Sequence, residues 1–336
     1  MGDGAGIGPE ILLALMRQSD PRRSGVIYGS ARVMQLTAHH FAHPLPLHTI
    51  SLAQWQQQPI LPQDPEQVTI IDVTAQLPHA AQEELATFDA IPFGEPRTAF
   101  GHLQRAALVA AIDDALAGRI AGICTAPLNK ALFAHADLPV TGHTEILAER
   151  TQTPEAVMML AGDRLRVSLV TTHLPLQAVS EHLTTDGILN TLQVTHSDLK
   201  RRWNMAQPRI AVAALNPHAG EQGNMGHEER EVIVPAIEAA QQAGIRAEGP
   251  FPADTLFARL RRDWPFDAVV CMYHDQGLIP LKLTHFGASA NITLGLPIVR
   301  TSVDHGTAYD IAGQGVADAD SMRYAFGLAL RLSQGG

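Results

Sequence analysis

Three histidines follow apolar runs in the same way, and together they predict a metal site. The segments VSLVTTHLP, RIAVAALNPHAG and DAVVCMYHDQG each contain a strand-like run, a few polar residues and then His173, His218 or His274 beside a turn. Ligands of an open α/β sheet gather beyond the carboxyl ends of its strands, so three such strands would bring three imidazoles to one edge. Three neutral imidazoles suit a catalytic divalent ion and leave coordination positions open for a substrate. The chain has 16 histidines, and a single histidine is more often a surface residue, so the prediction depends on the shared context.

Other predicted strand ends and helix starts add polar groups. The segment TAPLNK places Thr125, Asn129 and Lys130 after the apolar run AGIC. The segment TGHTE places His143 and Thr144 at a predicted helix start, where Thr144 can serve as an N-cap without any further role.

Two cations in apolar surroundings indicate an anionic ligand. Lys282 and Arg300 flank Asn291 in the stretch LIPLKLTHFGASANITLGLPIVR. A charge in such a setting is costly unless it meets a partner, and the guanidinium of an arginine offers paired donors to phosphate oxygens. We therefore expect Lys282 and Arg300 to meet a partner or an anionic ligand.

The chain opens with the glycine-rich stretch MGDGAGIGPE. It does not fit the dinucleotide pattern G-x-G-x-x-G, because Ile7 or Pro9 stands where the last glycine is needed. It predicts a turn followed by a helix, with Pro9 at the first helical position and Glu10 favourable near the positive end of the helix dipole. Such a start either faces an anion or forms a tight turn with no ligand. A turn of this kind normally follows a strand, so either the sheet lacks that strand or the natural chain starts upstream of Met1.

Apolar runs alternate with amphipathic segments, which predicts an α/β fold with a largely parallel sheet. Strand-like runs include GVIYGS, VTIIDV and GRIAGICTAP, and the segment 44–96 looks rich in loops. In the helix predicted over TAFGHLQRAALVAAIDDALAG, Leu108, Ile112 and Leu116 share one face while Asp113 and Asp114 lie away from it.

The composition excludes several classes of protein. With 336 residues, 46% of them hydrophobic, the chain can bury a large core and is expected to form two domains. A formal net charge of -10 and the lack of any Lys or Arg run argue against nucleic-acid or membrane-surface partners. Cys124 and Cys271 lie in apolar runs, which predicts buried thiols and no disulfide. We find no signal peptide and no membrane-spanning run, so we expect a cytoplasmic protein.

The chain resembles the 4-hydroxythreonine-4-phosphate dehydrogenases of the vitamin B6 pathway over nearly its whole length. The resemblance rests on MGDGAGIGPE, TAPLNK, GHTE, TTHLPL, LNPHAGE, GPFPADTLF, MYHDQGL and NITLGLPIVRTSVDHGTA, in that order. The GDG…IGPE start and HGTAYDIAG are also similar to motifs of the isocitrate and isopropylmalate dehydrogenases. This implies their two-domain αβα fold with a largely parallel sheet and an interdomain active-site cleft, which is not a Rossmann fold. Gly4 stands where the family usually has proline, and FGASANITLG differs from its commoner forms.

The resemblance assigns roles to particular residues. It implies one divalent ion, Zn, Mg or Co, on His173, His218 and His274, in a site completed across a homodimer interface. It implies substrate contacts by His143, Thr144, Lys282, Asn291 and Arg300, with the last three expected to hold the phosphate of the substrate. It implies that NAD, with NADP left open, lies along His305, Gly306, Thr307, Ala308 and Asp310. By analogy, 1–120 plus 280–336 form the cofactor-side domain and 121–279 the domain for metal, substrate and dimerisation.

The implied reaction oxidises the 3-hydroxyl of 4-phosphohydroxy-L-threonine to a 3-oxo acid. That acid decarboxylates to 3-amino-2-oxopropyl phosphate on the way to pyridoxal 5'-phosphate. Lys130 and Asp254 are both candidates for the general base, although Asp254 also suits an N-cap before TLFARL. Three alternatives stay open: a same-fold dehydrogenase for threonate or erythronate 4-phosphate, a metal-dependent hydrolase, and a purely structural metal-binding protein.

Overall fold

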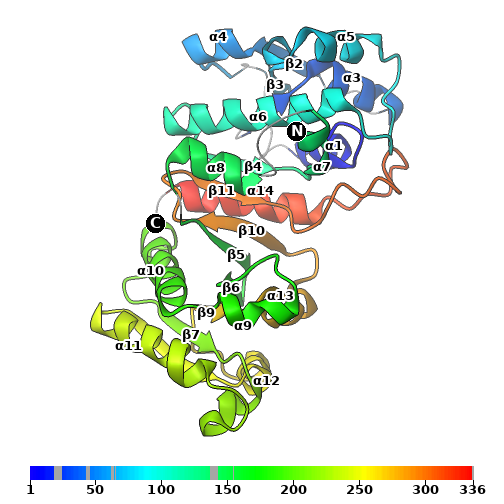
Figure 1. Cartoon of the computed structure of the whole chain (residues 1–336). Coiled ribbons are helices and arrows are strands. Elements are labelled where there is room, and N and C mark those ends of the chain that lie inside the picture. Colours follow the sequence, from blue (N-terminus) through cyan, green and yellow to red (C-terminus); the bar gives the residue numbers. More distant parts are fainter. Residues whose placement is uncertain are drawn as a thin grey trace. The chain divides into compact units, whose positions relative to one another are not determined.

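The computed structural model describes residues 1–18, 25–42, 46–61, 64, 66–136, 143–153 and 155–334 (Figure 1). The chain forms two compact units. The first contains Met1–Thr153 and Pro297–Leu330, and the second contains Pro154–Leu296 and Arg331–Gly336. The units therefore change at 153/154 and 296/297, whereas the sequence predicted domain changes at 120/121 and 279/280.

The first unit combines a small parallel sheet with a second pair of parallel strands. Strands β1 (Ile27–Gly29), β3 (Val68–Asp72) and β2 (Leu47–Ser51) pair in that order, and β4 (Gly122–Thr125) pairs with β11 (Val299–Ser302). Its helices are α1 (Gly8–Met16), α3 (Ala31–His40), α4 (Leu52–Gln57), α5 (His79–Thr87), α6 (Thr98–Leu116), α7 (Ala131–His135), α8 (His143–Thr151) and α14 (Asp320–Ser333). The segment 44–96 thus holds β2, α4, β3 and α5 and is less loop-rich than predicted.

Two details of the first unit differ from the sequence-based expectation. Helix α1 begins at Gly8, so Pro9 is its second residue and not its first. In α6, Leu108 and Ile112 are buried as predicted, but Leu116 is 44% exposed and Asp114 is fully buried. Asp114 is buried because the Tyr28 hydroxyl donates to its carboxylate at 2.6 Å and the Arg119 guanidinium donates at 2.8 Å. A carboxylate with such partners can leave water, and apolar periodicity alone does not reveal them.

The second unit is a sheet with helices on both faces. Its strands run in the order β10 (Ser289–Leu294), β5 (Val157–Gly162), β6 (Arg166–Leu169), β9 (Ala268–Cys271), β7 (Arg209–Ala213) and β8 (Arg246–Phe251). Only the pairings of β5 are antiparallel among those within the described parts of the two units. The largely parallel α/β architecture predicted from the sequence is confirmed. The helices are α9 (Val179–His182), α10 (Thr185–Arg202), α11 (Val234–Gln242), α12 (Ala253–Ala258) and α13 (His274–His285).

Neighbouring residues of β6 show why both faces are covered. Successive side chains of a strand point to opposite faces. Val167 packs against Gly277 of α13, where a Cβ atom would lie 2.2 Å from Val167 Cγ1. Ser168 points the other way, and the Thr195 hydroxyl of α10 donates to its Oγ at 2.8 Å. A strand buried on both faces reads as a continuous apolar run, as β9 does with Ala268–Cys271.

Cys124 and Cys271 are both free, as predicted; Cys271 is buried as expected, whereas Cys124 is half-buried. Burial of its thiol raises the pKa of Cys124 to about 11. Within the described ranges, every helix is too short or too polar to span a bilayer.

Candidate active site

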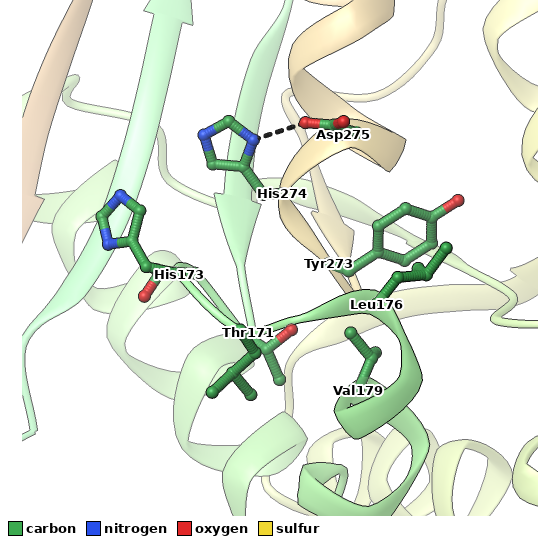
Figure 2. A pocket seen from close by; sticks show the side chains of 9 residues that line it. Thr171, His173, Leu176, Val179, Tyr273, His274 and Asp275 are labelled. Carbon is green, nitrogen blue, oxygen red and sulfur yellow. Dashed lines mark hydrogen bonds and ion pairs between the residues drawn. The ribbon is translucent and has the colours of Figure 1, made fainter.

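A pocket of about 490 Å³ lies at the carboxyl ends of β6 and β9 (Figure 2). Its wall is formed by the loop that follows β6 and by the start of α13, through Thr171, Thr172, His173, Leu174, Leu176, Val179, Tyr273, His274 and Asp275. The two strands are parallel neighbours, so their following loops leave the sheet at the same edge. This is the edge at which the sequence predicted imidazoles.

The rings of His173 and His274 lie side by side in this pocket, with centroids 5.9 Å apart and planes inclined by 42°. The Nδ1 atom of His274 lies 2.7 Å from Oδ1 of Asp275. A carboxylate only accepts hydrogen bonds, so Nδ1 carries a proton, and in the neutral ring Nε2 then keeps its lone pair. Figure 2 shows the His274 ring between Asp275 and His173, with Asp275 on its Nδ1 side. A carboxylate behind a histidine in this way fixes the ring of a metal ligand.

His218 lies on the loop after β7, the strand on the other side of β9. Its turn, Pro217–Gly223, has an uncommon backbone, because φ is positive at six successive residues, including 53° at His218 and 60° at Gln222. Four of the six carry side chains, and the left-handed region costs each of them about 1–2 kcal/mol. Such a turn persists only where its surroundings hold it.

These positions can be compared with the predicted metal site. Two imidazoles on one ion, with bonds of about 2.0–2.1 Å, have ring centroids roughly 5–6 Å apart, and His173 and His274 fit this spacing. Among the described residues of a single chain, however, no three His, Cys, Asp or Glu side chains are grouped to bind one ion. The structure therefore brings together two of the predicted ligands and places His218 on a neighbouring loop.

Two residues that the sequence analysis missed connect the three loops. Thr171 donates to the carbonyl oxygen of Met272 from its N–H at 3.2 Å and from its hydroxyl at 2.7 Å. Gln276 accepts from the Met272 N–H at 2.8 Å and donates to the Ala214 carbonyl at 2.5 Å. The ends of β6, β9 and β7 are joined in this way. The available signal was position, since Thr171 stands two residues before His173 and Gln276 two residues after His274.

The predicted phosphate ligands occupy both units. Lys282 is half-buried on α13, and Asn291 on β10 has a buried amide oxygen without a hydrogen-bond partner among the described residues. In the first unit, Arg300 on β11 is 3% exposed, and its Nη2 donates to Thr125 Oγ1 at 2.8 Å. Burial lowers the pKa of Arg300 to about 10, so the guanidinium is still a cation at neutral pH.

Helix α8 begins at His143, in agreement with the predicted helix start. The side chains of His143 and Thr144 lie outside the described part of the chain.

The segment proposed to bind the cofactor packs against the glycine-rich start. The N–H of Ile7 donates to the Thr307 carbonyl at 3.0 Å, and a Cβ atom on Gly6 would lie 2.8 Å from that oxygen. The Tyr309 hydroxyl donates to Asp3 and accepts from the Asn129 amide at 2.7 Å. The remaining predicted residues, His305, Gly306, Ala308 and Asp310, lie on the same segment, with Ala308 at a φ of 43°.

The two candidate bases lie in different settings. Lys130 is exposed just before α7, in the first unit. Asp254 is exposed in the first turn of α12, and its Oδ1 accepts from the Thr255 N–H at 2.8 Å. The interpretation of Asp254 as an N-cap is wrong, because the helix begins at Ala253 and its N-cap is Pro252.

Comparisons with known proteins agree on one family. Residues 22–329 match the family model described as Pyridoxal phosphate biosynthetic protein PdxA. A protein of Desulforapulum autotrophicum named 4-hydroxythreonine-4-phosphate dehydrogenase is 43% identical over 333 residues, covering 98% of this chain and 93% of that protein. The crystal structure of 4-hydroxythreonine-4-phosphate dehydrogenase from Klebsiella pneumoniae superimposes with a TM-score of 0.86 at 37% identity, covering 99% of this chain and 98% of that one. A terephthalate 1,2-cis-dihydrodiol dehydrogenase from Burkholderia xenovorans has a TM-score of 0.64 at 26% identity, covering 98% of this chain and 96% of that one.

Proposed function

The chain belongs to the family of Pyridoxal phosphate biosynthetic protein PdxA, and we propose that it is a 4-hydroxythreonine-4-phosphate dehydrogenase. In this proposal it oxidises the 3-hydroxyl of 4-phosphohydroxy-L-threonine, with transfer of hydride to NAD. The 3-oxo acid then loses carbon dioxide to give 3-amino-2-oxopropyl phosphate. The observation that carries the proposal is the pair of imidazoles, His173 and His274, in a pocket at the carboxyl ends of parallel strands.

A divalent ion, Zn, Mg or Co, is part of the proposal. His173 and His274 would hold it through ring nitrogens, and His218 would supply the third. A bound cation stabilises the alkoxide that forms as the alcohol loses its proton. Asp275 keeps the proton on Nδ1 of His274, so Nε2 of that ring is available as a ligand.

The phosphate is assigned to Lys282, Asn291 and Arg300. Support comes from the burial of the Arg300 cation, because an anion stabilises a buried positive charge. His143 and Thr144, at the start of α8, are assigned to the substrate as well. Lys130 and Asp254 remain the candidates for the base that takes the hydroxyl proton.

The nicotinamide cofactor is assigned to the first unit, along His305, Gly306, Thr307, Ala308 and Asp310. The contact between Ile7 and Thr307 supports this, because it links the glycine-rich start to that segment. NAD is proposed as the cofactor, and NADP is the alternative to be tested beside it. The two free thiols fit a reducing cytoplasm, where we place the enzyme.

A homodimer that completes the site is also part of the proposal. Helix α13 begins with His274 and exposes two large apolar side chains on successive turns, Ile279 at 57% and Leu283 at 82%, and the residue that follows the helix, Phe286, is 90% exposed. A row of this kind on a monomer marks an association surface. A second copy that packs on this row would therefore contact the same helix whose first residue is His274.

The second candidate is a dehydrogenase of the same fold for another substrate, such as threonate or erythronate 4-phosphate. The similarity to a dihydrodiol dehydrogenase supports keeping it, because that protein has the same fold and a different substrate in its name. Activity that does not need the 2-amino group of the substrate would favour it. A metal-dependent hydrolase is the third candidate and would release phosphate without reducing NAD.

The deciding experiment is an NAD reduction assay with 4-phosphohydroxythreonine, with and without a chelator. We expect NADH only with metal present, and recovery when Zn, Mg or Co is added back. His173→Ala should lose bound metal and reduce turnover more than the about 10²- to 10⁴-fold expected for Lys130→Ala, because a general base contributes that much. Free phosphate without NADH would support the hydrolase. Full turnover of His173→Ala would refute the metal assignment.

A further inference from the structure

The turn that carries His218 is held by one buried carboxylate. Glu229 is 5% exposed and accepts from the Asn216 N–H at 2.7 Å and from the Asn216 side-chain amide at 3.0 Å. Glu229 also lies against the far side of the turn, where a Cβ atom on Gly220 would be 2.6 Å from its Oε2. The carboxylate thus contacts the turn two residues before His218 and two residues after it.

The turn needs such support because of its backbone. His218, Ala219, Glu221 and Gln222 all have positive φ values, which side chains disfavour. Left without partners, this stretch would relax and the imidazole would move with it. Two backbone bonds also close the turn: the Ala219 N–H donates to the Asn216 carbonyl at 3.2 Å and the Met225 N–H to the Gly220 carbonyl at 3.0 Å. Neither satisfies the Asn216 N–H, which donates to Glu229.

The segment that supplies Glu229 is itself irregular. Glu229–Ile233 forms a single π-helical turn before α11, and such turns are rare and frequent at functional sites. The preceding residue, Glu228, accepts from the Asn216 side-chain amide at 2.8 Å and from the Ser180 hydroxyl at 2.5 Å. The side chain of Asn216 therefore donates to the carboxylates of both Glu228 and Glu229. Of these two residues, only Glu229 also accepts from the backbone N–H of Asn216 and lies against Gly220.

We infer that Glu229 is the positioning residue of the metal site, which holds the left-handed turn so that His218 is presented at the edge of the sheet. It does not touch the metal or the substrate and acts through Asn216 and Gly220. The inference rests on the proposed function, in which His218 is a metal ligand.

The test measures metal binding apart from turnover. Co²⁺ is titrated into metal-free protein and followed by its visible absorption, for the parent chain, Glu229→Gln, His218→Ala and Glu231→Gln. The glutamine of Glu229→Gln keeps the size but replaces an acceptor oxygen with a donor that faces the Asn216 amide. We expect Co²⁺ binding to weaken by about 10- to 100-fold, as for other residues that orient a ligand.

A second readout separates positioning from direct ligation. At saturating Co²⁺, Glu229→Gln should regain the absorption spectrum and the turnover number of the parent, because the ligand set is intact. His218→Ala should regain neither. Glu231→Gln is the matched control, since Glu231 lies in the same turn but is exposed and pairs with Arg230. It should bind Co²⁺ as the parent does.

Each outcome decides between the two proposals. Unchanged Co²⁺ affinity in Glu229→Gln, with weakened affinity in His218→Ala, would overturn the role of Glu229 and leave the metal site standing. Unchanged affinity in His218→Ala would instead refute the metal assignment itself. If Glu229→Gln does not fold, Asn216→Ala takes its place, because it removes the side-chain amide that donates to Glu228 and Glu229 while the backbone N–H bond to Glu229 remains. It should weaken Co²⁺ binding in the same direction.

Discussion

At the scale of single residues, the sequence predicted which residues form the site better than it predicted their hydrogen-bond partners. His173 and His274 could be found because each follows a buried parallel strand. The sequence also indicated that Arg300 sits among apolar residues, and its burial confirms that. The hydrogen bonds of Thr171 and Gln276 could not be predicted, because they join strand ends that are distant in the sequence. The left-handed turn at His218 was hidden for a similar reason, since its support comes from Glu229.

Gln276→Glu tests the polar link between two of these strand ends. A carboxylate can still accept from the Met272 N–H, but it cannot donate to the Ala214 carbonyl and would face that oxygen without a proton. We expect the free energy of unfolding to fall by about 1–3 kcal/mol, the usual cost of leaving a buried polar group unsatisfied.

The measurement is chemical denaturation at neutral pH. Gln241→Glu is the control, because Gln241 makes the same kind of bond, to the Ala247 carbonyl at 2.8 Å, from an exposed position. An equal decrease in the free energy of unfolding of both variants would show that the buried hydrogen bonds of Gln276 contribute no more to stability than the exposed bond of Gln241.

At the scale of elements, alternation of apolar runs was enough to predict the parallel α/β architecture. It was not enough for the glycine-rich start, whose glycines have specific neighbours. A Cβ atom on Gly4 would lie 2.5 Å from Cε1 of Phe100, a fully buried residue of α6. The departure from the usual family proline at this position therefore matches the ring packed against it.

Gly4→Ala should lower the free energy of unfolding by about 1–3 kcal/mol, because overpacking a closed core forces side chains off their preferred rotamers. Thermal melting measures the loss. Phe100→Leu removes the ring atoms that clash, so the double variant should be less destabilised than the sum of the two single variants. Additive losses would show that Gly4 and Phe100 do not share the space.

The last residue of α13, His285, accepts a hydrogen bond through a ring nitrogen that can be protonated. His285 is buried, and its Nε2 accepts from the Arg164 N–H at 3.1 Å. Burial lowers the pKa of His285 below the usual 6.5, with the nearby Asp163 acting in the opposite direction and Arg164 in the same one. Protonation would also remove the acceptor. The unfolded chain therefore binds this proton more readily than the folded chain does.

The free energy of unfolding should consequently fall as the pH drops below about 6.5. His285→Gln, which cannot be protonated, should flatten this part of the profile. Melting curves between neutral and mildly acidic pH provide the measurement, with the exposed His79→Gln as the control. An unchanged slope in His285→Gln would assign the acid sensitivity to other groups.

At the scale of the whole molecule, the proposed association of two copies of the chain is the feature that is least visible in the sequence. Ile279 and Leu283 lie on a helix whose other face is buried, and Phe286 follows directly after it, so their exposure is visible only in the structure. We expect Leu283→Glu combined with Phe286→Glu to convert the proposed dimer to monomers, as measured by sedimentation. Leu116→Glu replaces an apolar side chain that is 44% exposed on α6 and should leave the dimer intact. A monomeric parent chain would refute the dimer.

One helix, α13, provides both a histidine of the site at its first residue and an apolar row further along. If two copies of the chain associate through that row, the fraction of active enzyme depends on the concentration of the protein. Specific activity would decline on dilution even though each chain stays folded, and saturating cation would postpone the decline by favouring the associated form. The concentration of the enzyme in its cell would then be one of the quantities that set its output.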